Sequence, residues 1–178
     1  MRQAGSASLP CEIRLIRLSL GICRSVKSKL LTDEPGGRRY ALVFSPGDEI
    51  MAEVKRFAEA ERLRAAEFTG IGALESAKLA AFDPQAKEYV DIPVNEQTEL
   101  ASMNGRITLP KDADPENPPD ERQLHVHCTL ARRDGSAIGG HVLEATVRPT
   151  CEVFVSETAG HLTRHEDDYS GLPVISID

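Results

Sequence analysis

The pattern of apolar and polar positions becomes regular near residue 39. An apolar run of strand length, residues 40–44, ends at the turn signal Ser45-Pro46-Gly47. Apolar residues then recur at helical spacing between residues 48 and 64, and Asp48 is a favourable N-cap. These patterns predict a strand followed by an amphipathic helix over residues 48–64.

The segments after residue 70 have the spacing and turn residues of strands. Gly70-Ile71-Gly72-Ala73 predicts a break, and residues 110–120, which are acidic and rich in proline, predict an exposed loop. The strands that we expect cover residues 74–83, 87–92, 96–103, 105–109, 122–131, 137–147 and 150–157, with turns at 83–85, 104–105 and 133–135. The predicted fold class is α+β: a single domain in which a mostly antiparallel sheet packs with one main helix, and with a second short helix as an option.

Size and composition are those of one globular domain. The chain has 178 residues, and its hydrophobic content of 40% is sufficient for a core. Apolar runs stay shorter than the roughly 18 to 20 residues that a membrane span requires. The four cysteines have no CxxC spacing, which fits a reducing compartment. We therefore expect a cytoplasmic protein without a membrane partner.

The charge changes sign along the chain. Six basic residues and one acidic residue give residues 1–29 a net charge of +5, whereas the whole chain carries −7, so residues 30–178 carry −12. Three interpretations of residues 1–29 remain open: a disordered basic arm, a targeting segment, or a translated upstream region with the true start near Val26. We treat residues 1–29 as an N-terminal extension and residues 30–178 as the domain.

Three histidines are the best candidates for chemistry. Alternation along residues 124–130 places Cys128 on an apolar core face and both His125 and His127 on the opposite face. The hairpin at residues 133–135 should bring His141 beside them.

Three neutral imidazoles around one point suit Zn²⁺ or another divalent transition metal, with a fourth position left for water or a ligand. Cys128 should point away from such a site. The alternative is that the histidines only form hydrogen bonds, in an interface or on an exposed sheet face.

Two further residues are weaker candidates. Glu99 could be a general base or a carboxylate partner of the histidine site, although an exposed glutamate is common in a strand. Arg164, together with His161 and His165, could contact an anion, although such residues are more often solvated.

Several motifs, in this order and spacing, resemble the plants-and-prokaryotes-conserved (PPC) domain over residues 34–173. They are Gly70-Ile71-Gly72-Ala73, residues 99–105, Leu124-His125-Val126-His127, Asp134-Gly135, Gly139-Gly140-His141 and Thr150-Cys151-Glu152-Val153. The resemblance implies a compact α+β domain, assembly as a homotrimer, and histidines near the surface between subunits. In plants the domain accompanies AT-hooks and is linked to DNA binding, and stand-alone bacterial members are commonly labelled DNA-binding by similarity.

The charge of the domain argues against DNA. An AT-hook needs an Arg-Gly-Arg-Pro core, which this sequence lacks, and a net charge of −12 opposes contact with phosphates. A local basic patch from Arg132, Arg133 and Arg148, or the N-terminal extension, could still supply such contact. We therefore predict a homotrimeric binding protein with a three-histidine metal site and a DNA-associated or regulatory role. The alternatives are a metal-dependent enzyme acting on a small substrate and a scaffold that recruits partners.

Overall fold

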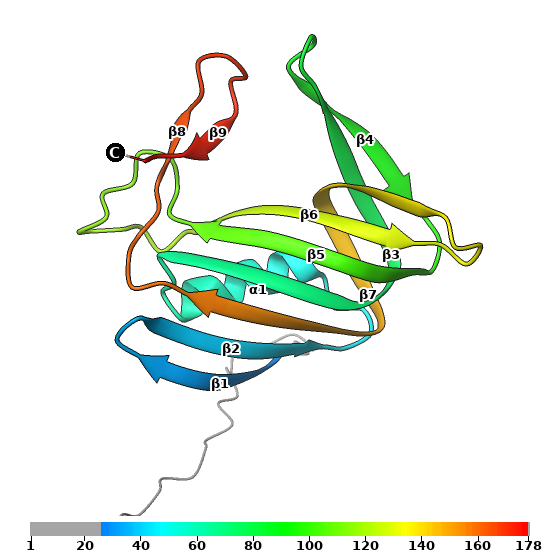
Figure 1. Ribbon diagram of the computed structural model, residues 1–178, viewed down its shortest axis with the longest axis horizontal. Helices are drawn as coiled ribbons and strands as arrows, with labels where there is room; N and C mark the ends of the chain where they lie inside the picture. Colours follow the sequence, from blue (N-terminus) through cyan, green and yellow to red (C-terminus); the bar gives the residue numbers. More distant parts are fainter. Residues whose placement is uncertain (1–25, 178) are drawn as a thin grey trace, which may run out of the picture.

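The computed structural model describes residues 26–177 (Figure 1). Residues 1–25 of the N-terminal extension lie outside the described residues, so the three interpretations of that segment stay predictions. Strand β1 (Lys27–Glu34) begins within the segment that the sequence assigned to the extension, and it pairs antiparallel with β2 (Gly37–Phe44).

An antiparallel sheet dominates the domain. Its strands follow the order β1-β2-β7-β6-β5-β3-β4, and β7 also pairs with β3. The further strands are β3 (Ala65–Asp83), β4 (Glu88–Val94), β5 (Thr98–Thr108), β6 (Gln123–Ala131) and β7 (Ala137–Glu157). The pairings β3–β5, β5–β6, β6–β7 and β7–β3 form a closed circuit. Two hairpins project from the same side of this body, namely β3–β4 and the small pair β8 (Arg164–Glu166) and β9 (Pro173–Ile175) (Figure 1).

The helix is shorter than predicted. Helix α1 (Ile50–Ala60) is the one α-helix among the described residues, and the optional second helix is absent from them. Its N-cap is Glu49, whose carboxylate accepts from the backbone N–H groups of Met51 and Ala52 at 3.1 and 2.7 Å. Asp48, the predicted cap, instead accepts from the N–H of Ser45. The helix ends because Arg62 takes a left-handed conformation, with φ of 54°.

Three predicted interruptions are wrong. Strand β7 runs through Arg148-Pro149, where the sequence predicted a gap between the strands at residues 137–147 and 150–157. Strand β3 runs through residues 70–73, where the register shifts between Gly70 and Gly72 but pairing continues. Strand β5 runs through Asn104-Gly105. A Cβ atom on Gly105 would lie 2.1 Å from Cζ of Phe68, so this glycine makes room for a core ring and not for a turn.

The other main features agree with the sequence. Residues 110–120 form a largely exposed loop, and turns join β3 to β4 and β6 to β7 near the predicted positions. Helix α1 lies against β7 and β6, with Ile50, Val54, Phe57 and Ala58 buried. Cys128 faces the core, as predicted, and burial raises the pKa of its thiol to about 11. Within residues 26–177, no helix has the length and apolar character needed to cross a bilayer.

Candidate metal centre

The three histidines meet on one face of neighbouring strands. His127 of β6 stands directly opposite His141 of β7 in the register, and His125 lies two residues along β6 on the same face. The ring centroids are 5.0 to 5.4 Å apart. The Nε2 atoms of His125 and His127 are 3.1 Å apart, and one nitrogen from each of the three rings lies within 4.8 Å of the others. The structure therefore brings together the three residues that the sequence singled out.

Two glycines position the third ring. A Cβ atom on Gly140 would lie 2.8 Å from the carbonyl oxygen of Ala80 in β3, and one on Gly139 would lie 2.7 Å from that of Cys128 in β6. Side chains here would push the strands apart. The Gly-Gly pair thus lets β7 approach both neighbours closely, so that His141 reaches the pair on β6.

The surroundings favour neutral imidazoles. Burial, reinforced by the neighbouring His125 and His127, lowers the pKa of His141 to about 4. Burial also lowers the pKa of His125, with smaller effects from His127, Arg164 and Arg106. Neutral imidazole is the form that binds metals, so these rings need not lose a proton at neutral pH. The Nδ1 atom of His141 is buried and has no hydrogen-bond partner among the described residues.

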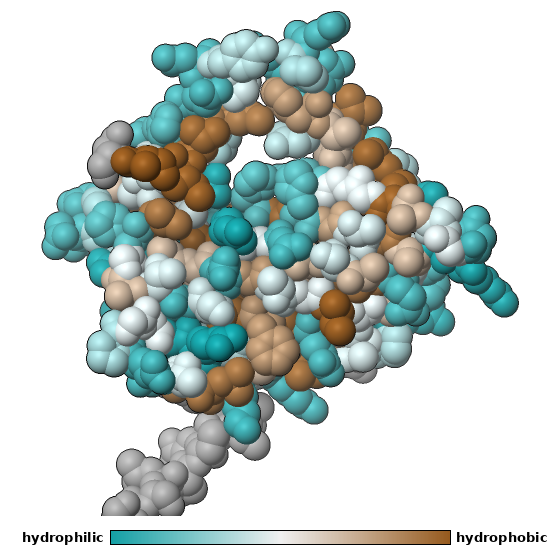
Figure 2. All heavy atoms as spheres, viewed as in Figure 1, coloured by the Kyte–Doolittle hydropathy of each residue, from teal (hydrophilic) through white to brown (hydrophobic). Residues whose placement is uncertain are grey.

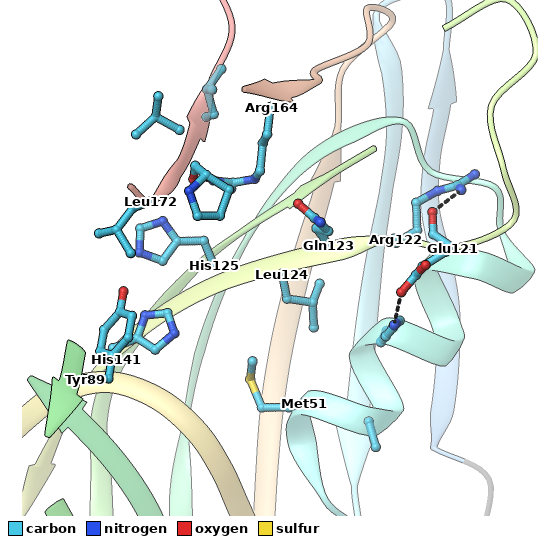
Figure 3. Close-up of a pocket in the computed structure, with 15 residues that line it drawn as sticks. Met51, Tyr89, Glu121, Arg122, Gln123, Leu124, His125, His141, Arg164 and Leu172 are labelled. Atoms are coloured by element: carbon cyan, nitrogen blue, oxygen red, sulfur yellow. Dashed lines mark hydrogen bonds and ion pairs between the residues drawn. The ribbon is translucent and has the colours of Figure 1, made fainter. Parts of the chain in front are cut away.

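A pocket of roughly 690 Å³ adjoins the cluster. His125 and His141 form part of its wall, with Tyr89 of β4 stacked on His141 at a centroid distance of 4.9 Å. Figure 3 shows these three rings turned toward one another, with Arg164 reaching in from β8. Of the two weaker candidates, Arg164 is thus brought beside the histidines.

Glu99 is not brought to this site. It lies on β5 opposite Ala131 and Ala73, and it lines a different pocket together with residues that include Thr150 and Glu152. His161 is exposed, and Nδ1 of His165 lies 3.2 Å from the hydroxyl of Ser176. Neither of these two histidines lines the pocket that contains Arg164.

Sequence reasoning missed most of the pocket wall. Tyr89, Met51 and the residues of β9 come from three distant segments. A strand pattern marks Tyr89 as one aromatic residue among others, and no spacing rule connects it to His141. The pairing of β4 with the far end of β3 makes the connection.

A sequence profile of the Plants and Prokaryotes Conserved (PCC) domain matches residues 31–159. The chain belongs to this family. Its expected resemblance to the PPC domain is therefore confirmed. Solved structures related to this PCC domain include a metal-containing protein from Archaeoglobus fulgidus, which is 30% identical in sequence and has a TM-score of 0.70. The match covers 79% of this chain and 94% of the chain from Archaeoglobus fulgidus. A plant- and prokaryote-conserved protein from Pyrococcus horikoshii is also 30% identical, with a TM-score of 0.69 and coverage of 79% and 92%.

Two further matches have lower sequence identity to this chain. A proposed DNA-binding protein from Bacteroides thetaiotaomicron shares the fold at 24% identity, a TM-score of 0.71, and coverage of 84% and 96%. The bifunctional protein GlmU from Synechococcus sp. (strain JA-3-3Ab) is 28% identical over 120 residues, which are 67% of this chain. The PCC domain spans only 16% of that protein's length.

Proposed function

We propose that this PCC domain is a homotrimeric binding protein that holds a divalent transition metal, with zinc as the best fit, at His125, His127 and His141. The observation that carries the proposal is the convergence of three imidazoles on one face of β6 and β7. Ligand nitrogens about 2.0–2.1 Å from a tetrahedral zinc ion are roughly 3.4 Å from one another. The 3.1 Å separation of the Nε2 atoms of His125 and His127 is close to that value.

The donor set also fits the metal. Three histidines and no carboxylate make up the cluster, which suits zinc better than magnesium or calcium. The Nδ1 atom of His141 is buried without a hydrogen-bond partner among the described residues, which supports a ligand at this ring. The relative from Archaeoglobus fulgidus is a metal-containing protein, which supports the same proposal for this chain.

Elemental analysis of the purified full chain tests the proposal. We expect about one metal ion for each chain, and replacement of any one histidine by alanine should weaken affinity at least 10- to 100-fold, as changes in groups that merely support metal ligands do. Because the cluster lies outside the apolar core, the variants should stay folded by circular dichroism. His161→Ala, at an exposed histidine elsewhere, is the matched control. A metal-free wild-type protein that cannot be loaded with zinc would refute the proposal.

An exposed apolar surface supports the trimer. Val43, Ile71 and Phe154 are 41%, 61% and 48% exposed, and they surround Glu152 on the outer face of β2, β3 and β7. Burial of such residues between copies would remove apolar area from water. Light scattering should give three times the monomer mass of 19.4 kDa. The double change Ile71→Lys with Phe154→Lys should lower that mass, and a monomeric wild-type chain at micromolar concentration would contradict the assembly.

Two roles fit a metal-binding trimer. The proposed DNA-binding relative supports a DNA-associated or regulatory role, which the ion pairs of Arg132 with Glu96 and of Arg148 with Glu75 oppose. The second candidate is a metal-dependent enzyme, and the pocket beside the histidines favours it because a substrate there would reach the metal site. Zinc would supply Lewis-acid chemistry to such a reaction.

A further inference from the structure

The pocket beside the histidine cluster has the form of a site for a small molecule. Its volume of roughly 690 Å³ lies in the range of ligand pockets. The walls come from β4, β6, β9 and α1, and they are mainly apolar, with Met51, Leu124, Leu172 and Val174 among the lining residues. Figure 2 shows hydrophobic side chains gathered along the inner edges of the two projecting hairpins, with an opening between them. A ligand could enter through this opening.

Arg164 is the unusual group in this wall. The residue is only 5% exposed, although it carries a charge. Its Nε donates to the hydroxyl of Thr108 at 2.9 Å and its Nη1 donates to the carbonyl of Pro173 at 2.8 Å, while its Nη2 is buried without a hydrogen-bond partner among the described residues. Both partners are neutral, and no carboxylate in the described part forms an ion pair with this guanidinium. A buried charge normally has a counter-ion, so an anion is the partner that this guanidinium would be expected to have.

Among residues 26–177, no acidic side chain supplies that anion. Glu121 is the one carboxylate among the residues that line the pocket, and Lys55 holds it at 3.0 Å. Glu166, two residues from Arg164, is bound to Lys111 at 2.8 Å. The guanidinium of Arg122, also in the wall, donates to backbone carbonyls, including that of Leu63, while its backbone N–H donates to Glu59. The lining therefore keeps a net positive charge within a domain that is strongly negative as a whole.

We propose that this pocket binds a small organic carboxylate. The carboxylate pairs with the guanidinium of Arg164, which lines the pocket, and the apolar part of the molecule lies against Met51, Leu124 and β9. One unpartnered guanidinium NH₂ group among apolar walls suits a single carboxylate better than a phosphate, which takes more donors. This inference extends the proposed function. It rests on that function for any contact between the bound carboxylate and the metal site.

Calorimetric titration of the full chain with hexanoate and with its neutral analogue hexanamide tests the inference. We expect saturable binding of hexanoate and binding of hexanamide about 10- to 100-fold weaker, because the amide oxygen can still accept from the guanidinium but the ion pair is lost. Arg164→Gln should weaken the binding of hexanoate by a similar factor and weaken that of hexanamide much less. Arg148→Gln, at an exposed arginine paired with Glu75, is the matched control. Equal binding of the two probes, or no hexanoate binding at millimolar concentration, would overturn the inference.

If Arg164→Gln does not fold, a second variant tests whether hexanoate binds in this pocket. Ala52 lies on the exposed side of α1 and lines the pocket, so Ala52→Phe should fill the space and reduce hexanoate binding at least tenfold while Arg164 remains. Ala60→Phe, at an exposed site on the same helix away from the pocket, is its control. Hexanoate binding that Ala52→Phe leaves unchanged would place the carboxylate elsewhere and refute the inference.

Metal removal separates this inference from the proposed function. The titrations are repeated with zinc-loaded protein and with protein treated with a chelator. Selectivity for hexanoate that persists in metal-free His127→Ala supports the carboxylate pocket, whatever the metal content of the wild type. Zinc binding at one ion for each chain without selectivity for hexanoate refutes the pocket and leaves the metal site standing.

Discussion

Two arginines of this domain are bound in opposite ways. Arg38 of β2 donates to both carboxylate oxygens of Glu157, at 2.6 and 3.0 Å, and to the carboxylate and carbonyl of Glu61, while its guanidinium lies 5.5 Å from the ring centre of Tyr40. Arg164 has only neutral partners and keeps one buried NH₂ group, that of Nη2, without a partner among the described residues.

The difference shows which region is structural and which is suited to a ligand. The hydrogen bond with Glu157 raises the pKa of Arg38, whereas burial lowers the pKa of Arg164. The first cluster satisfies its own charges and ties β2 to the ends of α1 and β7. The second cluster, around Arg164, has a donor without an acceptor and a charge without a counter-ion in the described part of the chain, beside the histidines. This is the condition expected of a binding site.

The comparison predicts unequal losses of stability. Arg38→Gln should lower the free energy of unfolding by about 2–3 kcal/mol, because it leaves two half-buried carboxylates without their cation. Arg164→Gln should cost only about 1 kcal/mol, because the loss of two hydrogen bonds to neutral acceptors is offset by removal of an unpaired buried charge. Urea unfolding of the metal-free proteins measures both values. An equal or larger loss for Arg164→Gln would mean that its charge is already satisfied.

Acid should act on the histidine side of the pocket. The pKa of His141 is about 4 in the folded protein, below the value of about 6.5 in an unfolded chain, so the unfolded state binds more protons between these values. The stability of the metal-free protein should therefore fall as the pH decreases from about 6.5 toward 4. His141→Gln should reduce this dependence, as measured by urea unfolding at pH 7 and pH 5. A slope that is unchanged in His141→Gln would contradict the assigned pKa.

The sequence contained enough to find the histidines but not their pocket. Alternation along β6 decides which face each side chain takes, and one tight turn fixes the strand of His141, so the cluster depends on local rules. The glycines at 70, 72 and 105 were misleading, because a glycine that admits a neighbouring ring or strand has the same local sequence as one that turns. The unmatched charge of Arg164 depends on contacts with residues distant in sequence, and no pattern along the chain reveals them.

Two surface arginines form ion pairs with carboxylates, as Arg38 does and, within residues 26–177, Arg164 does not. Arg132 lies 2.9 Å from Glu96, and Arg148 lies 3.2 Å from Glu75. These are two of the three arginines that the sequence offered as a basic patch. Because carboxylates already hold them, contact with a DNA phosphate would require breaking an ion pair and bringing a polyanion close to acids.

We therefore expect the affinity of this domain for DNA to be very low. A shortened chain that begins at Val26, just ahead of β1, should bind duplex DNA no tighter than about 10⁻⁴ M at physiological salt, the weak limit of nonspecific contact. Fluorescence anisotropy with a labelled duplex, at two salt concentrations, measures this. Submicromolar binding by the shortened chain that weakens steeply with salt would show that the ion pairs yield to phosphate. Binding by the full chain alone would assign the contact to the basic residues before Val26, because they supply the positive charge that the domain lacks.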